Sequence, residues 1–390
     1  MKQFLSARIA DITQSEIRNM TRECERVGGI NLGQGLGDLP TPPLVSEAAI
    51  QAIRDRKSTY SFPEGAAELR QMIADKLKRD NGITADPKSE ITVTIGSSGG
   101  YACAIMALLN PGDGILLCEP YYGYHLNAAI LAGLQPQFAT LAPPNFDLDE
   151  GVIRAALRPN TRAIVLCSPS NPSGRMYSAD EMKVIEKIAV ERDLLVITDE
   201  IYEYIIYDGR KHVSAATLPG LRDRTVTLMG LSKTFSITGW RLGYAVAPAG
   251  MSRAITLAND LFYVCSPTPL QHGVAAGFQS PPEFYTKLKS DYQRKRDIIC
   301  DGLAAAGLQP IVPQGAYYVL ADIGHLGYAR SKQAAMALLE TTGVASVPGT
   351  AFYQGETGEK LLRFCFAKED EILKEASKRI RAFKGAPAHA

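Results

Sequence analysis

The sequence has no long apolar run and no excess of either charge. Its 390 residues carry a formal net charge of +1, with 46% hydrophobic and 21% charged side chains. No apolar stretch approaches the ~18 residues that a transmembrane helix needs, and residues 1–20 lack the apolar core of a secretory signal. Without a basic stripe, nucleic-acid or anionic-membrane binding has no electrostatic basis. We therefore expect a soluble protein with one large and one smaller domain.

Cysteine and histidine occur without the spacings that disulfide frameworks or metal sites require. The chain has 7 cysteines and 5 histidines, with no C-x-x-C and no H-x-x-x-H pattern, so no metal site is expected. An odd number of cysteines, several in strand-like apolar runs (Cys118, Cys167 and Cys365), is typical of reduced thiols in a cytoplasmic protein. The sequence contains no internal repeat.

Two glycine-rich runs exclude nucleotide motifs. Residues 31–38 read NLGQGLGD, which is not G-x-G-x-x-G, and prolines follow where the helix of a dinucleotide motif should begin. Residues 95–100 read IGSSGG and lack the Gly-Lys-Ser/Thr of a triphosphate-binding loop. Because this second run follows a strand and opens a helix, it still has the geometry of an anion site.

Apolar runs of strand length alternate with helical patterns through the middle of the chain. Strands are expected over residues 91–95, 114–118, 161–167, 194–198, 225–228 and 242–246. Helices are expected over residues 99–109 and 124–131 and after Ser178, which with Glu181 matches a capping box. Continuous apolar strands alternating with helices predict an α/β fold with a sheet covered on both faces.

The C-terminal third has a different pattern. Helices are expected over residues 282–306, 331–341 and 368–383, and short strands over 316–320, 344–347 and 361–366. This mixture predicts a smaller α+β domain. Residues 385–390 have the composition of a frayed tail.

The most informative stretch is SKTFSITGWR, residues 232–241. Lys233 has apolar flanks, which predicts an amine in an interior cleft, where burial lowers the pKa and supplies the neutral form. Arg241 can hold a phosphate. A Schiff-base lysine beside a phosphate-binding arginine is what pyridoxal 5'-phosphate (PLP) requires, together with a carboxylate for its pyridine nitrogen. The alternative is a solvated surface lysine.

Two further motifs precede that stretch. Residues 194–202, LLVITDEIY, contain Asp199 after a buried strand, where ligands of open α/β sheets collect. Residues 168–174, SPSNPSG, contain Asn171. Alone, the first could end any strand and the second could be an ordinary turn. In this order, the three segments resemble the class I/II aminotransferases of PLP fold type I, over about residues 30–366.

The resemblance implies both architecture and reaction. It implies a large α/β domain over residues 46–285, with a mostly parallel seven-stranded sheet covered by helices, and a small α+β domain from residues 1–45 and 286–390. It implies transfer of an amino group from an L-amino acid to a 2-oxo acid by a ping-pong mechanism through a Lys233 aldimine. The active unit would be a cytoplasmic homodimer with shared active sites.

The same resemblance implies roles for individual residues. Lys233, Asp199 and Tyr202 would carry the chemistry, with Asp199 on the pyridine nitrogen. The remaining cofactor contacts would be Gly96, Ser97, Ser98 and Arg241 at the phosphate, Tyr122 stacked on the ring, Asn171 and Tyr202 at its O3' oxygen, and Tyr60 from the neighbouring subunit.

Arg363 is a lone charge inside the apolar run LLRFCF, residues 361–366. Because an unpaired buried arginine is costly, it needs an anionic partner. The resemblance assigns it the substrate α-carboxylate, with Gly35 and Asn171 nearby. A buried protein carboxylate is the alternative.

Several positions depart from the family pattern. Gly37 and Leu39 stand where many relatives carry proline and an aromatic residue, and Gly230 stands where some carry a phosphate-binding serine. A PLP-dependent lyase, synthase, cyclase or oxidase therefore remains the alternative, whereas a PLP-dependent regulator is disfavoured because no helix-turn-helix precedes the catalytic body. Residues 206–212 and 224–227 look most like relatives acting on aromatic, kynurenine-like or aliphatic amino acids.

Overall fold

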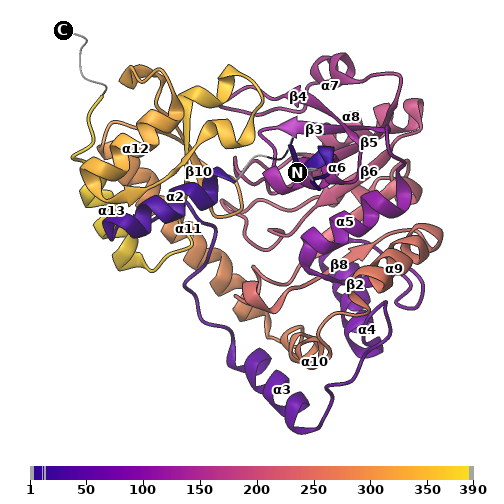
Figure 1. The fold of residues 1–390 in the computed structure, drawn as a ribbon. Coiled ribbons are helices and arrows are strands. Elements are labelled where there is room, and N and C mark those ends of the chain that lie inside the picture. Colours follow the sequence, from indigo (N-terminus) through magenta and orange to yellow (C-terminus); the bar gives the residue numbers. More distant parts are fainter. Residues whose placement is uncertain (1–3, 11, 13–14, 386–390) are drawn as a thin grey trace.

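A computed structural model describes residues 4–10, 12 and 15–385 (Figure 1). Apart from Gly385, the tail expected over residues 385–390 lies outside the described residues. None of the described helices is both long enough and apolar enough to cross a bilayer.

The larger part of the molecule is built on a seven-stranded sheet of order β2-β8-β7-β6-β5-β3-β4. Its strands are β2 (Ile91–Ile95), β3 (Gly114–Glu119), β4 (Gln135–Thr140), β5 (Thr161–Cys167), β6 (Leu195–Asp199), β7 (Thr225–Gly230) and β8 (Leu242–Val246). All neighbours are parallel except β8, which runs antiparallel to both β2 and β7. The predicted mostly parallel sheet is therefore confirmed.

Strand β4 has no counterpart among the expected strands. Its sequence, QPQFAT, lacks a continuous apolar run, and only alternate residues are buried. It lies at the edge of the sheet beside β3, where a strand tolerates Pro136 and needs only one apolar face. The prediction rested on continuous apolar runs and so could not detect an edge strand.

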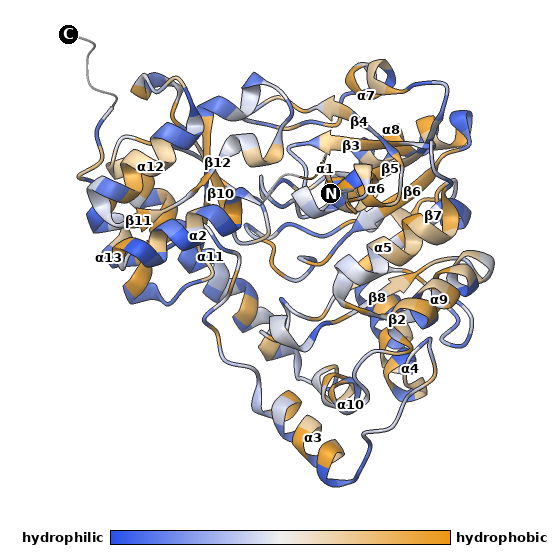
Figure 2. Ribbon diagram, viewed as in Figure 1, coloured by the Kyte–Doolittle hydropathy of each residue, from blue (hydrophilic) through white to orange (hydrophobic). Residues whose placement is uncertain are grey.

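Helices cover both faces of this sheet, and its inner strands are buried along most of their length. Figure 2 shows hydrophobic residues concentrated along the central strands and hydrophilic residues on the outer helices. The covering helices include α4 (Ala67–Lys76), α5 (Gly96–Leu108), α6 (Gly123–Leu131), α7 (Glu150–Ala156), α8 (Ala179–Arg192) and α9 (Ala249–Tyr263). Helix α3 (Pro43–Arg54) packs mainly against α10 (Thr268–Gly277), which in turn contacts α4 (Figure 1). The capping box expected at Ser178 and Glu181 is present at the start of α8.

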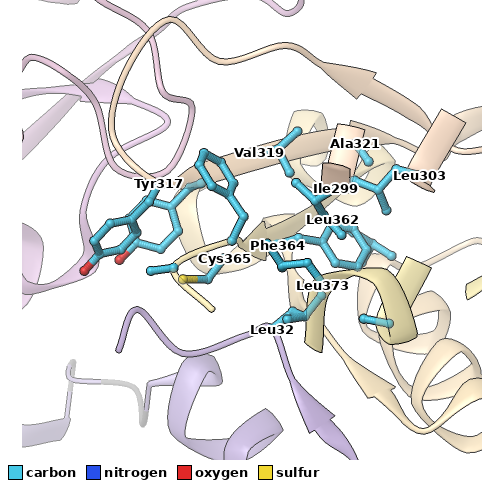
Figure 3. Close-up of a cluster of buried hydrophobic side chains, with 14 of the residues drawn as sticks. Leu32, Ile299, Leu303, Tyr317, Val319, Ala321, Leu362, Phe364, Cys365 and Leu373 are labelled. Carbon is cyan, nitrogen blue, oxygen red and sulfur yellow. The ribbon is translucent and has the colours of Figure 1, made fainter. Parts of the chain in front are cut away.

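The smaller part combines a four-stranded antiparallel sheet with helices. Its strands are β9 (Gln309–Ile311), β10 (Tyr318–Asp322), β12 (Val347–Pro348) and β13 (Leu361–Cys365). A separate parallel pair joins β1 (Ile30–Asn31) to β11 (Val344–Ala345). The helices are α2 (Glu16–Val27), α11 (Pro282–Ala305), α12 (Ser331–Thr342) and α13 (Asp370–Ile380). Leu32, Ile299, Leu362, Phe364 and Leu373 share one hydrophobic cluster, with Tyr317 at its edge (Figure 3).

Two of the expected C-terminal strands differ from the structure. The strand expected over residues 316–320 begins instead at Tyr318, because Ala316 has a φ of +57°, which an extended strand cannot contain. The strand expected over residues 344–347 is divided into β11 and β12, which belong to different sheets. Position 316 is an alanine, so composition offered no sign of a left-handed residue there.

Candidate active site

Three parallel strands deliver site residues to one edge of the large sheet. Strand β6 ends at Asp199, and β5 ends at Cys167, which is in register with Asp199. The segment after β5 carries Asn171, and the segment after β3 carries Tyr122. Because carboxyl ends of parallel strands meet at one edge, the fold brings these side chains to the same region.

Lys233 follows strand β7 and is mostly removed from solvent. Its pKa is lowered to about 8, mainly by burial; the charge of Arg241 contributes to this fall, while Cys365 and Asp199 oppose it. Its Nζ lies 5.3 Å from the centre of the Tyr317 ring. The amine therefore titrates close to physiological pH and can act as nucleophile or base, which an ordinary lysine does poorly.

The first turn of α5 forms an anion cradle with Arg241. The helix begins at Gly96 without a side-chain cap, so its first N–H groups and its positive dipole end are open to a ligand. Arg241 Nη2 donates to Ser98 Oγ at 3.3 Å. A Cβ on Gly96 would lie 2.6 Å from Arg241 Nη2, and one on Gly243 would lie 2.6 Å from Ser97 N. Both glycines are needed for this close packing.

Asp199 has a partner that sequence reasoning missed. His125 Nε2 lies 3.1 Å from Asp199 Oδ2, and both side chains are buried. The histidine ring contacts Tyr101 at 4.6 Å and the edge of Tyr122 at 5.3 Å between centroids. From the sequence, the histidines were considered only as metal ligands. The one sequence feature that could have indicated a role for His125 is its position in the helix directly after Tyr122. Its contact fixes the orientation of the carboxylate.

Tyr202 belongs to a cluster of three buried tyrosines. Its Oη donates to Tyr318 Oη at 3.2 Å, and its ring stands edge-on to Tyr317 at 5.0 Å. Burial raises the Tyr202 pKa well above its usual value, so the phenol stays protonated and remains a donor. The sequence alone places Tyr317 and Tyr318 only within the strand expected over residues 316–320 and assigns neither to the site.

Arg363 is fully buried in β13. Its Nη1 donates to Asn171 Oδ1 at 2.9 Å and its Nη2 to the Gly33 carbonyl at 2.6 Å, while Nε has no hydrogen-bond partner. Among the described residues, no carboxylate forms an ion pair with it. The guanidinium therefore lacks the buried protein carboxylate that was the alternative, and its charge has room for an external anion.

Gly35 lies beside this arginine for a steric reason. Tyr317 Oη donates to the Gly35 carbonyl at 2.9 Å, and a Cβ at Gly35 would lie 2.0 Å from Tyr318 Oη. Any larger residue would displace the tyrosine pair. The Gly33–Gly35 backbone is thereby held against the guanidinium of Arg363.

Tyr60 lies in an exposed loop, with 80% of its surface accessible in the single chain. The loop is nevertheless held in place by buried Gln271, whose Oε1 accepts from Ala66 N at 2.7 Å and whose Nε2 donates to Ser61 Oγ at 3.1 Å. The structure therefore presents Tyr60 outward on an ordered support.

A cavity of about 620 Å³ adjoins Tyr122. Phe352, another of its lining residues, has its ring 4.8 Å from the guanidinium carbon of Arg363. Most lining side chains are aromatic, aliphatic, amide or hydroxyl groups, and Glu16 is the charged residue among them. A second cavity, of about 770 Å³, lies between residues 143–147 and 309–314 and contains none of the predicted site residues.

The lowered pKa of Lys233 predicts its chemical reactivity. In the chain without ligands, acylation of Lys233 should rise with pH to a midpoint near 8, because only the neutral amine reacts. Lys183 is a matched surface control whose pKa is raised by Asp180. Peptide mass spectrometry after brief labelling across a pH series measures both. A Lys233 midpoint equal to that of Lys183 would contradict the proposed burial.

Comparison with known proteins matches residues 27–380 to the family described as aminotransferase class I and II. The probable N-succinyldiaminopimelate aminotransferase DapC of Mycobacterium tuberculosis H37Rv is 33% identical, covering 98% of this chain and 99% of its own length. Aromatic-amino-acid aminotransferase 2 of Thermococcus litoralis is also 33% identical, with coverages of 96% and 97%.

The solved structure of N-succinyldiaminopimelate aminotransferase from Mycobacterium tuberculosis matches with a TM-score of 0.94 at 34% identity, covering 97% of this chain and 99% of that one. This match confirms the expected fold type I. The chain belongs to the class I and II aminotransferase family and is an enzyme that transfers an amino group between an amino acid and a 2-oxo acid.

Proposed function

We propose that the enzyme binds PLP through Lys233 and works by a ping-pong mechanism on L-amino acids. The observation that carries the proposal is a buried lysine of lowered pKa close to both an uncapped helix start with Arg241 and the carboxylate of Asp199. When bound, PLP supplies an aldehyde that condenses with amines and a ring that withdraws electrons from the substrate Cα.

The residues present fit that group. The first turn of α5, with Gly96, Ser97 and Ser98, and the Arg241 guanidinium suit a phosphate dianion. Asp199, oriented by His125, suits a protonated ring nitrogen. We assign Tyr122 to the ring face and Asn171 and Tyr202 to the ring oxygen.

Lys233 then has two tasks. As a neutral amine it would be the nucleophile that holds the cofactor aldehyde, and the same Nζ would accept the Cα proton of the substrate. A pKa of about 8 suits both tasks, because the amine is neither permanently protonated nor too weak a base.

Arg363 holds the substrate α-carboxylate in this proposal. Its Nε is a buried donor with no partner, and its charge has no carboxylate beside it among the described residues. Asn171 and the backbone at Gly33 and Gly35 orient the guanidinium. A bidentate carboxylate contact would satisfy both the charge and the free donor.

We propose bulky aromatic or aliphatic L-amino acids as substrates. The cavity of about 620 Å³ next to Tyr122 supports this, because its lining is rich in aromatic rings: Tyr121, Tyr122, Tyr124, Phe138, Phe352 and Tyr353. Neither lysine nor arginine is among the described residues that line it, so it offers no partner for a second carboxylate. The resemblance of residues 206–212 to aromatic and kynurenine-type relatives points the same way.

We further propose a homodimer in which Tyr60 reaches the phosphate of the partner's site. Tyr60 and Phe62 are 80% and 73% exposed, and Leu261 on α9 is 86% exposed. Large exposed apolar side chains on an ordered surface are typical of an interface. The seven cysteines are all free, which supports a reducing, cytoplasmic environment.

The division into domains at residues 45/46 and 285/286 also stays a proposal. Met20 and Leu32 share a hydrophobic cluster with Phe364, whereas Val45 packs with Phe235 in a cluster of the large sheet. Helix α11 runs unbroken across the second boundary.

Borohydride reduction tests the central proposal. Reduction of the PLP-loaded protein should place a pyridoxyl adduct on Lys233, and Lys233→Ala should fold, bind PLP without a covalent link and lose turnover. Peptide mass spectrometry and absorbance spectra measure these outcomes. An adduct on a different lysine would rule out the assignment of Lys233.

Arg363→Lys tests the substrate-carboxylate site. Lysine keeps the charge but loses the planar fork, so kcat/KM for phenylalanine should fall about 10- to 100-fold, the scale of one or two charge-assisted hydrogen bonds. Phenethylamine, which lacks the carboxylate, should form its first adduct equally well with both proteins. A variant that is mainly less thermally stable, with unchanged KM for phenylalanine, would show a structural role instead.

Mixed dimers test the shared site. Lys233→Ala and Tyr60→Phe subunits should each be impaired alone. Each hybrid dimer regains one intact site of its two. If half of the dimers in a random mixture are hybrids, the mixture should recover roughly a quarter of wild-type activity. Activity is measured after refolding the two chains together, with each chain refolded alone as the control. Full wild-type activity in a preparation shown to be monomeric would refute the proposal.

A further inference from the structure

Tyr318 contacts both halves of the proposed site. It is 3% exposed and opens strand β10. The guanidinium carbon of Arg363 lies 4.3 Å from the centre of its ring, and its Oη accepts a hydrogen bond from Tyr202 Oη at 3.2 Å. The absence of a side chain at Gly35 leaves room for this hydroxyl. One buried phenol thus joins the proposed carboxylate anchor to the proposed partner of the ring oxygen.

We propose that Tyr318 is a positioning residue that transmits the occupancy of the carboxylate site at Arg363 to the hydroxyl of Tyr202, and so to the ring oxygen of the cofactor. This inference rests on the proposed function. Asn171, which accepts from Arg363 Nη1 and is assigned to the same ring oxygen, already offers one link between the two groups. Tyr318 adds a second link through Tyr202, which shares no hydrogen bond with Arg363 among the described residues.

The coupling follows from the single proton of a phenol. In the structure Tyr202 gives its hydrogen to Tyr318. To donate to a ring oxygen, Tyr202 must turn that hydrogen away, and the contact with Tyr318 survives only if Tyr318 then donates to Tyr202. A chain from Tyr318 through Tyr202 to the oxygen results, in which each bond polarises the next and strengthens it.

Arg363 controls the first donor of this chain. Burial raises the pKa of Tyr318 to about 12, and the positive charge of Arg363 opposes that rise, making the phenol a better donor. The other titratable groups that face Tyr318 include Cys365 on β13, Tyr202 after β6, Tyr317 on its own chain segment, Tyr122 before α6 and Tyr292 on α11. A carboxylate bound to Arg363 neutralises the favourable charge, so Tyr318 and then Tyr202 become weaker donors.

The sign of the effect can be measured on the cofactor itself. A strong donor at the ring oxygen stabilises the oxygen anion most when the neighbouring Schiff-base nitrogen has lost its proton, so it lowers the spectral pKa of that nitrogen. Weakening the chain therefore raises this pKa. Carboxylate binding at Arg363 should raise it too, partly by removing a positive charge directly and partly through Tyr318.

The test is Tyr318→Phe in the PLP-loaded enzyme, titrated by absorbance with and without saturating 3-phenylpropionate, which carries a carboxylate but no amine. The free-enzyme spectral pKa should rise by about 0.5 to 1 unit, a range typical of one altered hydrogen bond. The further rise caused by 3-phenylpropionate should be smaller than in the wild type. Tyr202→Phe should abolish the effect of Tyr318→Phe when the two are combined.

Tyr207→Phe is the matched control. Tyr207 is another buried tyrosine of the same cluster, and its hydroxyl donates to the Ala316 carbonyl and touches neither Arg363 nor Tyr202. This variant loses a buried phenol hydrogen bond and should leave the spectral pKa unchanged.

An unchanged or lowered pKa in Tyr318→Phe would overturn the proposal, since a fall would show that Tyr318 only competes for the Tyr202 proton. Binding of 3-phenylpropionate to the cofactor-free variant, followed by calorimetry, should remain within about threefold of wild type, because Arg363 keeps its other partners. A larger loss of affinity for 3-phenylpropionate would show that Tyr318 only supports carboxylate binding at Arg363. Failure of the proposed function itself would appear separately, as absence of a pyridoxyl adduct on wild-type Lys233.

Discussion

The guanidinium of Arg363 is a full positive charge inside an apolar strand, and its contacts with Asn171 and Gly33 are all to neutral oxygens. A buried charge without a counterion costs several kcal/mol, so the surrounding structure has to hold it in a fixed geometry. The arginine and its two partners come from three separate segments. Strand β13 carries the arginine, the segment after β5 supplies Asn171, and the segment after β1 supplies Gly33. The arginine therefore joins the two parts of the molecule where the substrate is proposed to bind.

The need to hold the buried Arg363 guanidinium in a fixed geometry also explains neighbouring residues that have no obvious chemical role. Tyr318 and Phe352 cover the guanidinium with their rings, which limits hydration without satisfying its charge. Gly35 is small because the Tyr318 hydroxyl occupies the space of a side chain. The site is thus left with a cation that has no anionic partner among the described residues, which is why the substrate carboxylate is proposed for it.

Around Lys233 and Asp199, the surrounding groups influence the protonation of the amine and the orientation of the carboxylate. Burial removes the lysine proton more readily, while His125 holds the aspartate in place at the end of β6. The α5 start, with Arg241, adds positive potential for a phosphate, and the charge of Arg241 also contributes to the lowered lysine pKa. Amine, carboxylate and anion cradle are therefore electrostatically linked, since each alters the protonation or orientation of another.

Motifs that are continuous in the chain were accessible from the sequence. Lys233 and Arg241 lie in one short run, the strands of the large sheet are continuous apolar segments, and the Ser178 cap follows a local rule. The order of the Asn171, Asp199 and Lys233 motifs was enough to indicate the family. Motifs and the periodicity of apolar residues can be read directly from the order of residues, so these features could be predicted without knowledge of the tertiary structure.

Features that depend on contacts between distant segments were not accessible. His125 meets Asp199, and Tyr318 meets Tyr202 and Arg363, only because segments far apart in the sequence pack against one another in the fold. Edge strand β4 and the left-handed backbone of Ala316 were not predicted, because their residue types are ordinary and packing against neighbouring segments sets their conformation. The sequence by itself determined the fold family and singled out Lys233 as the candidate reactive lysine, since both depend on local patterns. Tertiary structure alone decided which buried side chains surround that lysine and the arginine, because packing brings those groups together.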